Sequence, residues 1–254
     1  MGCTAIVLEN AWRNTAITAS AGIDNPEHTK NQLRGLLATT AATAQVSFNF
    51  GSTQVIDTLY IAQPSLAFSY RLRLYSELNQ AGVVSDTGWI SAGGYLPLGV
   101  FRVGVDPWGE PTERDFEYLP TMSGMSGILE FQGVTAISHI TLGKAWRPSY
   151  GASIGVSDDL ITGIDWVETV GGSMSPQHLK SPRRQLEFTL NHLSAQERKD
   201  FVTQFRRGRG EWVLIDLTAG DLRKEHFAVG ALTISPIKWA NSNYHSVSCT
   251  LMEF

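Results

Sequence analysis

Short runs in which apolar and polar residues alternate fill the first half of the chain. Residues 45–50 place Val46, Phe48 and Phe50 on one face, and residues 68–75 alternate in the same way. Further strand candidates are residues 4–9, 55–61, 100–105, 128–131 and 135–142. Short strands with turn signals about every 8–12 residues predict a β-sandwich or barrel.

Between these runs the polar and small residues predict connections. Residues 19–30 carry Gly, Asp, Asn and Pro and predict a long loop, and Gly51–Ser52 predicts a turn. Residues 123–127 contain two Gly and two Ser and predict a flexible link, and residues 31–37 predict one helical turn. An acidic, Pro-bearing loop is expected over residues 106–120.

The pattern changes at residues 143–148. Beyond them, residues 165–170 and 184–190 alternate, residues 171–182 predict a mobile loop, and Ser194-Ala195-Gln196-Glu197 has the pattern of a capping box that begins a helix. Closing strands are expected at residues 211–217, 227–234 and 244–254. The chain is therefore predicted to be mainly β. We expect a jelly-roll β-sandwich over residues 1–147 and a smaller α+β domain with one main helix over residues 148–254.

Composition narrows the classes of protein. The 254 residues carry a net charge of −4 and only 17% charged residues, so the chain as a whole lacks the basic character of a nucleic-acid-binding protein. The low charge indicates either a surface buried in an assembly or strands with Ser, Thr and Asn outside. Acids cluster over residues 86–130 and bases over residues 175–210. These clusters suit either neighbouring subunits of a ring or two solvated faces.

The two cysteines, Cys3 and Cys249, stand near opposite ends and form either one disulfide or, as we expect, two buried free thiols. The sequence shows neither a signal-peptide pattern nor an apolar run of about 20 residues, so we expect a soluble protein made in a cytoplasm without membrane insertion.

Motifs for catalysis are missing from the sequence. It contains neither G-x-S-x-G nor a phosphate-binding loop, and its six histidines have no paired spacing. The acidic loop lacks the ligand spacing of a calcium site. We therefore expect no enzyme, no metal and no cofactor. A glycan hydrolase with two carboxylates remains an alternative without any indicated pair.

Exposed aromatic residues are the remaining candidates for binding. Trp89, Tyr95 and Trp108 fall at strand ends or loops, with Asp106 nearby. An aromatic ring packs on the apolar face of a sugar while a carboxylate binds its hydroxyls, so these four residues form a candidate glycan-binding set. Structural packing is the alternative for each of them. Trp146, Trp166, Trp212 and Trp239 are expected in cores or at a domain interface.

Several weak motifs, taken in order, resemble a known family. Residues 31–34, 45–51, 56–61, 70–73 and 86–89 are similar to the jelly-roll module of discoidin or galactose-binding type. More narrowly, they resemble its version in tail-tip and baseplate proteins of long-tailed bacteriophages (siphophages). Residues 140–148, followed by 150–155, are similar to the passage from the jelly roll to the second domain in those proteins.

This resemblance implies a structural virion component of a tail tip or baseplate. Such a protein would assemble in a symmetric ring and link the tail tube or hub to the distal apparatus. Its partners would be copies of itself and the hub, distal tail and tape-measure proteins, with no nucleic acid. A carbohydrate-binding adhesion module for host surface glycans is the alternative. Trp146 and Arg147 would set the angle between the domains.

Overall fold

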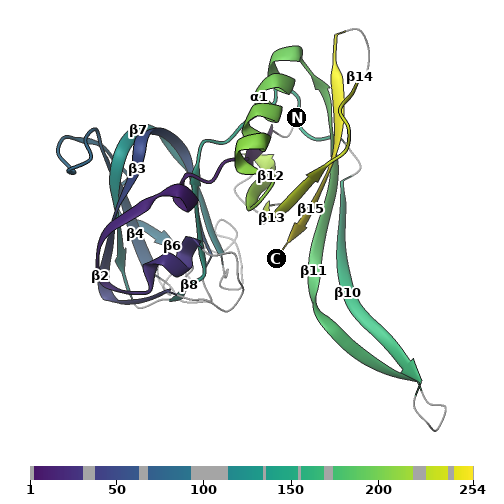
Figure 1. The fold of residues 1–254 in the computed structure, drawn as a ribbon, viewed down its shortest axis with the longest axis horizontal. Coiled ribbons are helices and arrows are strands. Elements are labelled where there is room, and N and C mark those ends of the chain that lie inside the picture. The colour runs from purple at the N-terminus through teal and green to yellow at the C-terminus, as the bar shows by residue number, and fades with distance from the viewer. Residues whose placement is uncertain are drawn as a thin grey trace, which may run out of the picture. The chain divides into compact units, whose positions relative to one another are not determined.

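The computed structural model describes residues 3–30, 38–62, 68–92, 114–133, 136–153, 156–168, 174–219, 227–239 and 243–253. The described chain is mainly β with one α-helix, which confirms the predicted fold class (Figure 1). It forms two compact units. Glu9–Ala145 is called the sandwich unit below, and Met1–Leu8 with Trp146–Phe254 is called the helix-bearing unit.

The helix-bearing unit is made from both ends of the chain. Strand β1 (Cys3–Val7) pairs antiparallel with β12 (Val213–Ala219). Ile6 also exchanges two backbone hydrogen bonds with Trp146, with N···O distances of 2.9 and 2.8 Å. Residues 1–8 were predicted to belong to the first domain. The structure groups them with the second because their strand partner lies there.

The described residues of the sandwich unit form two 3₁₀ helices and eight strands. They are η1 (Ala11–Asn14), β2 (Ala16–Asp24), η2 (Pro26–Lys30), β3 (Ala38–Ala62), β4 (Phe68–Tyr75), β5 (Val83–Asp86), β6 (Ile90–Ala92), β7 (Arg114–Gln132), β8 (Ala136–Ile137) and β9 (His139–Gly143). The main strand order is β2-β3-β7-β4-β5. β6 pairs with β4, while β8 and β9 pair with β3.

Strands β3 and β7 form the long antiparallel pair of this unit. Their register runs from Thr43 opposite Gln132 to Ala62 opposite Arg114, with shifts between Asn49 and Gln54 and between Ile56 and Thr58. One half of the pair lies beside β2 and β4, and the other half lies beside β9. Side chains from both halves enter one core, so the sheet folds over on itself as a sandwich.

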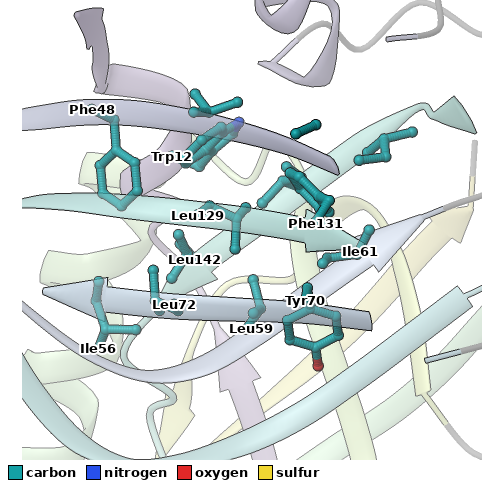
Figure 2. Close-up of a cluster of buried hydrophobic side chains, with 14 of the residues drawn as sticks. Trp12, Phe48, Ile56, Leu59, Ile61, Tyr70, Leu72, Leu129, Phe131 and Leu142 are labelled. Atoms are coloured by element: carbon teal, nitrogen blue, oxygen red, sulfur yellow. The ribbon is translucent and has the colours of Figure 1, made fainter. Parts of the chain in front are cut away.

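Figure 2 shows this core, in which Phe48, Leu129 and Phe131 of one half face Ile56, Leu59 and Ile61 of the other. Trp12 of η1 is fully buried, and its indole N–H donates to Thr29 Oγ1 at 2.9 Å. Its ring contacts Phe48 edge-on at 5.1 Å between centroids. A buried Trp with its N–H satisfied adds apolar area without an unpaired polar atom.

Several predicted connections in this unit lie wholly or partly within strands. The acidic loop predicted over residues 106–120 is strand from Arg114 onward, and its earlier residues lie outside the described part of the chain. Residues 19–30 form most of β2 and all of η2, Gly51–Ser52 lies within β3, and residues 123–127 lie within β7. At Gly127 an added Cβ would lie 2.4 Å from a ring atom of Phe48. This glycine therefore admits the Phe48 ring rather than breaking the strand. The predicted turn at residues 31–37 lies outside the described residues.

The sheet of the helix-bearing unit has the order β1-β12-β13-β15-β11-β10, with β14 on β15. The remaining bounds are β10 (Ser157–Glu168), β11 (Met174–Leu193), β13 (Phe227–Ile234), β14 (Lys238–Trp239) and β15 (His245–Glu253). Its core includes Ile6, Phe188, Val213, Val247 and Leu251. Cys249 is a buried free thiol in this core, and burial raises its pKa to about 12.

Helix α1 (Ala195–Gly208) begins at the predicted capping box. Ser194 Oγ accepts from Glu197 N–H at 3.2 Å, and Glu197 Oε2 accepts from Ser194 N–H at 2.8 Å. The helix ends at Arg209, which has a left-handed φ of 58°. Phe201 anchors the helix to the core and contacts Trp146 at 5.1 Å between ring centroids. None of the described helices is long and apolar enough to cross a bilayer.

Strands β10 and β11 continue beyond the rest of their sheet as a two-stranded ribbon (Figure 1). β11 pairs with β15 only over residues 185–193, whereas its pairing with β10 extends to Met174. The mobile loop predicted over residues 171–182 is therefore strand from Met174 onward. Pro182 falls at a register shift and Pro176 lies where β11 has one described partner, positions at which a strand tolerates proline.

Candidate functional site

A hollow of about 280 Å³ lies on the sheet of the sandwich unit. Thr43 and Gln45 of β3, Glu130 and Gln132 of β7, and Trp89 line it. Ala21 and Gly22 of β2 close one end. Its volume is just below the range of about 300–1,000 Å³ that is usual for small-molecule sites.

Strand alternation explains which side chains face the hollow. Val46 and Leu129 are buried in the sandwich core, so their neighbours Gln45 and Glu130 point to the opposite face. The same alternation puts Arg71 and Arg73 of β4 on this outer face, because Tyr70, Leu72 and Leu74 are buried. The hollow is therefore built on the polar side of the sheet whose apolar side forms the core.

A bulge in β3, opposite Gly22 of β2, shapes one end of the hollow, because β3 advances five residues from Thr40 to Gln45 while β2 advances two. The register between β2 and β3 shifts between Ala21 and Ile23, and Gly22 has a φ of +65°. An added Cβ at Gly22 would lie 2.3 Å from the carbonyl oxygen of Thr43. Only glycine fits both the left-handed backbone and this close approach.

Hydrogen bonds hold the turn that carries Trp89 against β4. Thr87 N–H donates to Leu72 O at 3.0 Å, and Leu72 N–H donates to Thr87 Oγ1 at 3.0 Å. Gly88 N–H donates to Asp86 Oδ1 at 2.8 Å. Trp89 nevertheless leaves 44% of its surface exposed. These bonds before Trp89, and the pairing of Ile90 with Tyr70 after it, fix the backbone on both sides of a large ring that the fold leaves partly exposed.

Paired charges lie on the same face. Arg71 Nε donates to Asp86 Oδ1 at 2.8 Å, and its Nη2 also bonds Asp86 Oδ2. Arg73 Nη2 donates to Glu130 Oε1 at 2.8 Å. The hydrogen bond from Arg71 is the main cause that lowers the pKa of Asp86 to about 2, opposed by partial burial and assisted by Gly88 N–H. The two arginines and two carboxylates balance each other in charge.

The hollow combines a flat apolar surface with hydrogen-bonding groups. An exposed indole offers a flat apolar surface, and the amides of Gln45 and Gln132 each offer a donor and an acceptor. Neither amide forms a side-chain hydrogen bond within the part of the chain that the structure describes. The carboxylate of Glu130 is engaged by Arg73. The described residues also contain no group of three or more metal-ligating side chains.

The structure places one of the four predicted glycan-binding residues. Trp89 lines the hollow, whereas Tyr95, Asp106 and Trp108 lie outside the described residues. Four other residues of the hollow were not predicted as site residues from the sequence: Gly22, Gln45, Glu130 and Gln132. Alternation alone places Gln45 and Glu130 on polar faces, but only the β3–β7 register brings those two faces together.

Two further residues were predicted to lie between the domains. Trp146 is 7% exposed and belongs to the core of the helix-bearing unit, where it contacts Phe201. Arg147 is exposed. Their role in setting an interdomain angle stays a prediction. Of the other tryptophans expected in a core or at an interface, Trp212 is buried but Trp239 is 72% exposed, so the core placement was wrong for Trp239.

Comparison with known proteins gives distant structural similarities. No family of protein sequences matches the chain, and no curated protein matches it. A Ruminococcus gnavus GH29 fucosidase in complex with fucose is 9% identical, with a TM-score of 0.39 over 54% of this chain and 27% of the fucosidase. CpGH89CBM32-6 of Clostridium perfringens is 12% identical, with a TM-score of 0.36 over 54% of this chain and 99% of its own. The chain thus spans about a quarter of the fucosidase, and no function is assigned from these similarities.

Proposed function

We propose that the sandwich unit is a non-catalytic carbohydrate-binding module in which Trp89 stacks on a sugar ring. One observation carries the proposal: a 44% exposed indole on a hydrogen-bonded turn lines the same hollow as Gln45 and Gln132, whose side-chain amides form no hydrogen bond with a described residue. Sugars present an apolar ring face and hydroxyls that both donate and accept, and this hollow offers a complement to each.

Preorganisation favours this function further. The hydrogen bonds of Thr87 and Gly88 restrict the Trp89 turn before any ligand arrives. Binding then requires little additional ordering of the protein, and more of the contact free energy appears as affinity.

A glycan array followed by calorimetry on the full chain tests the proposal. We expect Trp89→Ala to weaken binding at least about ten-fold, or about 1.4 kcal/mol. The control is Trp239→Ala, which removes an even more exposed tryptophan from the other unit and should leave affinity unchanged. Equal losses in both variants, or no glycan bound by the natural chain, would contradict the proposal.

The second candidate function follows the resemblance to siphophage tail-tip proteins: a structural virion component that assembles in a ring. The ribbon of β10 and β11 favours it. Among the described strands, β10 pairs only with β11, so its outer edge presents backbone groups that can accept a strand of another copy. Ile161 on this strand is 43% exposed. Both functions fit one protein, because an adhesion module can be displayed from a tail.

Self-association measured by analytical ultracentrifugation tests this second function. We expect Ile161→Glu to weaken association at least about ten-fold, because a charge on an edge strand opposes pairing. Glutamate would stand opposite Arg183 across the ribbon, so the ribbon itself should persist.

Val84→Glu is the matched control, since Val84 is a 52% exposed strand residue of the sandwich unit. A chain that stays monomeric at every concentration, and that is absent from tails seen by cryo-electron microscopy of purified virions, would overturn the tail assignment.

A further inference from the structure

We infer that the Trp89 hollow binds an internal stretch of an uncharged glycan chain that lies across the strands, rather than a single terminal sugar. This inference rests on the proposed carbohydrate-binding function. It is carried by the register of the four strands under and beside the hollow, by the charge balance of the face, and by the position of Trp89.

Strand register lines up polar side chains in two rows. In the first row Ala21 lies opposite Gln45, Gln45 opposite Glu130, and Glu130 opposite Arg71. Each row runs perpendicular to the strands, because these pairs are direct neighbours across the sheet.

The second row is two residues along the strands and is polar as well. Thr43 lies opposite Gln132, Gln132 opposite Ser69, and Ser69 opposite Ser91. Side chains separated by two residues on a strand share a face. A ligand that lies along the rows therefore meets hydrogen-bonding groups on both of its sides.

The length of these rows exceeds one sugar ring. From β2 through β3 and β7 to β4 there are three strand spacings of about 4.8 Å, or about 14 Å in all. The backbone of Trp89 lies beyond this end, on the turn that is bonded to Leu72 of β4, and Trp89 also lines the hollow. A ligand that follows the rows from Ala21 of β2 to Arg71 of β4 is therefore longer than one sugar ring.

The charges around the hollow favour an uncharged glycan. Asp86 and Glu130 neutralise Arg71 and Arg73, so the described residues of this face give it no surplus positive charge to attract an acidic glycan. Glu130 lines the hollow itself, and its carboxylate would repel a uronate, sulfate or phosphate group. Neutral hydroxyls, in contrast, can bond the amides of Gln45 and Gln132.

Calorimetry on the full chain with size-matched sugars tests the inference. The probes are glucose, galactose and mannose, the neutral hexasaccharides built from each, and a hexamer of galacturonic acid. We expect at least one neutral hexasaccharide to bind roughly ten-fold or more tightly than its monosaccharide. We expect the acidic hexamer to bind more weakly than every neutral hexamer that binds.

Single substitutions test whether the glycan contacts the two rows of side chains. Gln45→Ala and Gln132→Ala should each weaken hexasaccharide binding several-fold. Gln54→Ala removes an amide from β3 outside the hollow, where it bonds Ser52, and should change nothing.

The outcomes separate this inference from the proposed function. Equal affinity for monosaccharide and hexasaccharide, with the loss in Trp89→Ala retained, would overturn the internal-chain inference and leave carbohydrate binding standing. Tighter binding of the acidic hexamer would overturn the charge argument. Binding of no sugar by the array or this panel would overturn both.

Discussion

Single residues in the sandwich unit show how a buried polar group can set the pH range of a fold. His139 of β9 is 4% exposed, and its Nε2 lies 2.9 Å from Thr141 Oγ1. Burial lowers its pKa from 6.5 to about 3. The folded chain therefore holds this imidazole neutral at pH values where an unfolded chain would protonate it.

We predict that the sandwich unit loses stability as the pH falls from 6.5 toward 3. In that window the unfolded state binds one more proton at His139 than the folded state, so unfolding becomes more favourable as pH falls. The limiting slope for this one group is about 1.4 kcal/mol per pH unit. Thermal unfolding measured between pH 7 and pH 4 checks it.

The control for that prediction is His139→Gln, which retains a hydrogen-bonding side chain beside Thr141 but does not titrate. Its melting temperature should fall less steeply with pH than that of the natural chain. Parallel slopes for the two proteins would show that carboxylates alone govern the acid transition.

The same scale shows what a sequence reveals of a site. Trp89 was found because it is aromatic, follows Gly88 and precedes a short strand. Gly22 was missed because its role depends on the Thr43 carbonyl oxygen, which is 21 residues away in the chain but 2.3 Å from where a Cβ would lie. Through-space crowding of this kind leaves no local pattern.

At the scale of elements, apolar alternation and capping motifs predicted which strands and helices form better than they predicted where the strands begin and end. Helix α1 begins at Ser194 as its capping box indicates, because that motif depends on four consecutive residues. The strand predicted over residues 184–190 is instead the end of β11, which begins at Met174. Glycine, serine and proline usually interrupt strands, but a long partner strand supplies hydrogen bonds that outweigh their low propensity.

The turn predicted at Gly51–Ser52 illustrates the same limit. Gly51 has a φ of +75°, so a local left-handed residue was foreseeable, yet β3 continues through it. The register between β3 and β7 shifts between Asn49 and Gln54 of β3, and this shift accommodates the extra residues of β3. Whether such a glycine ends a strand or bends it depends on the neighbouring strand.

At the scale of the whole molecule, the change in sequence pattern at residues 143–148 coincides with the boundary between the two units, which lies between Ala145 and Trp146. The other boundary, between Leu8 and Glu9, has no such signal. One short strand at the start of a chain looks the same whether it joins the next strands or the last ones. Its partner, β12, is about 200 residues away in the chain. The alternation of apolar and polar residues in β1 does not reveal which distant strand it pairs with.

This arrangement makes the sandwich unit an insertion within the helix-bearing unit, with a consequence for the order of folding. Joining Ile6 to Trp146 through an unfolded segment would cost about 4 kcal/mol of loop-closure entropy. Inside the sandwich unit, Asn10 bonds both Ile140 O and Leu142 N–H at 3.1 Å, so once folded this unit already holds its own two ends together.

We therefore predict that the sandwich unit folds first and that β1 joins β12 last. Pulsed hydrogen exchange during refolding should protect β3 and β7 before β1 and β12, and Asn10→Ala should delay protection of β1 several-fold. Early protection of the β1 amides would contradict this order. During synthesis on a ribosome, β1 would then wait for β12 while more than 200 intervening residues were made, because β12 begins at Val213.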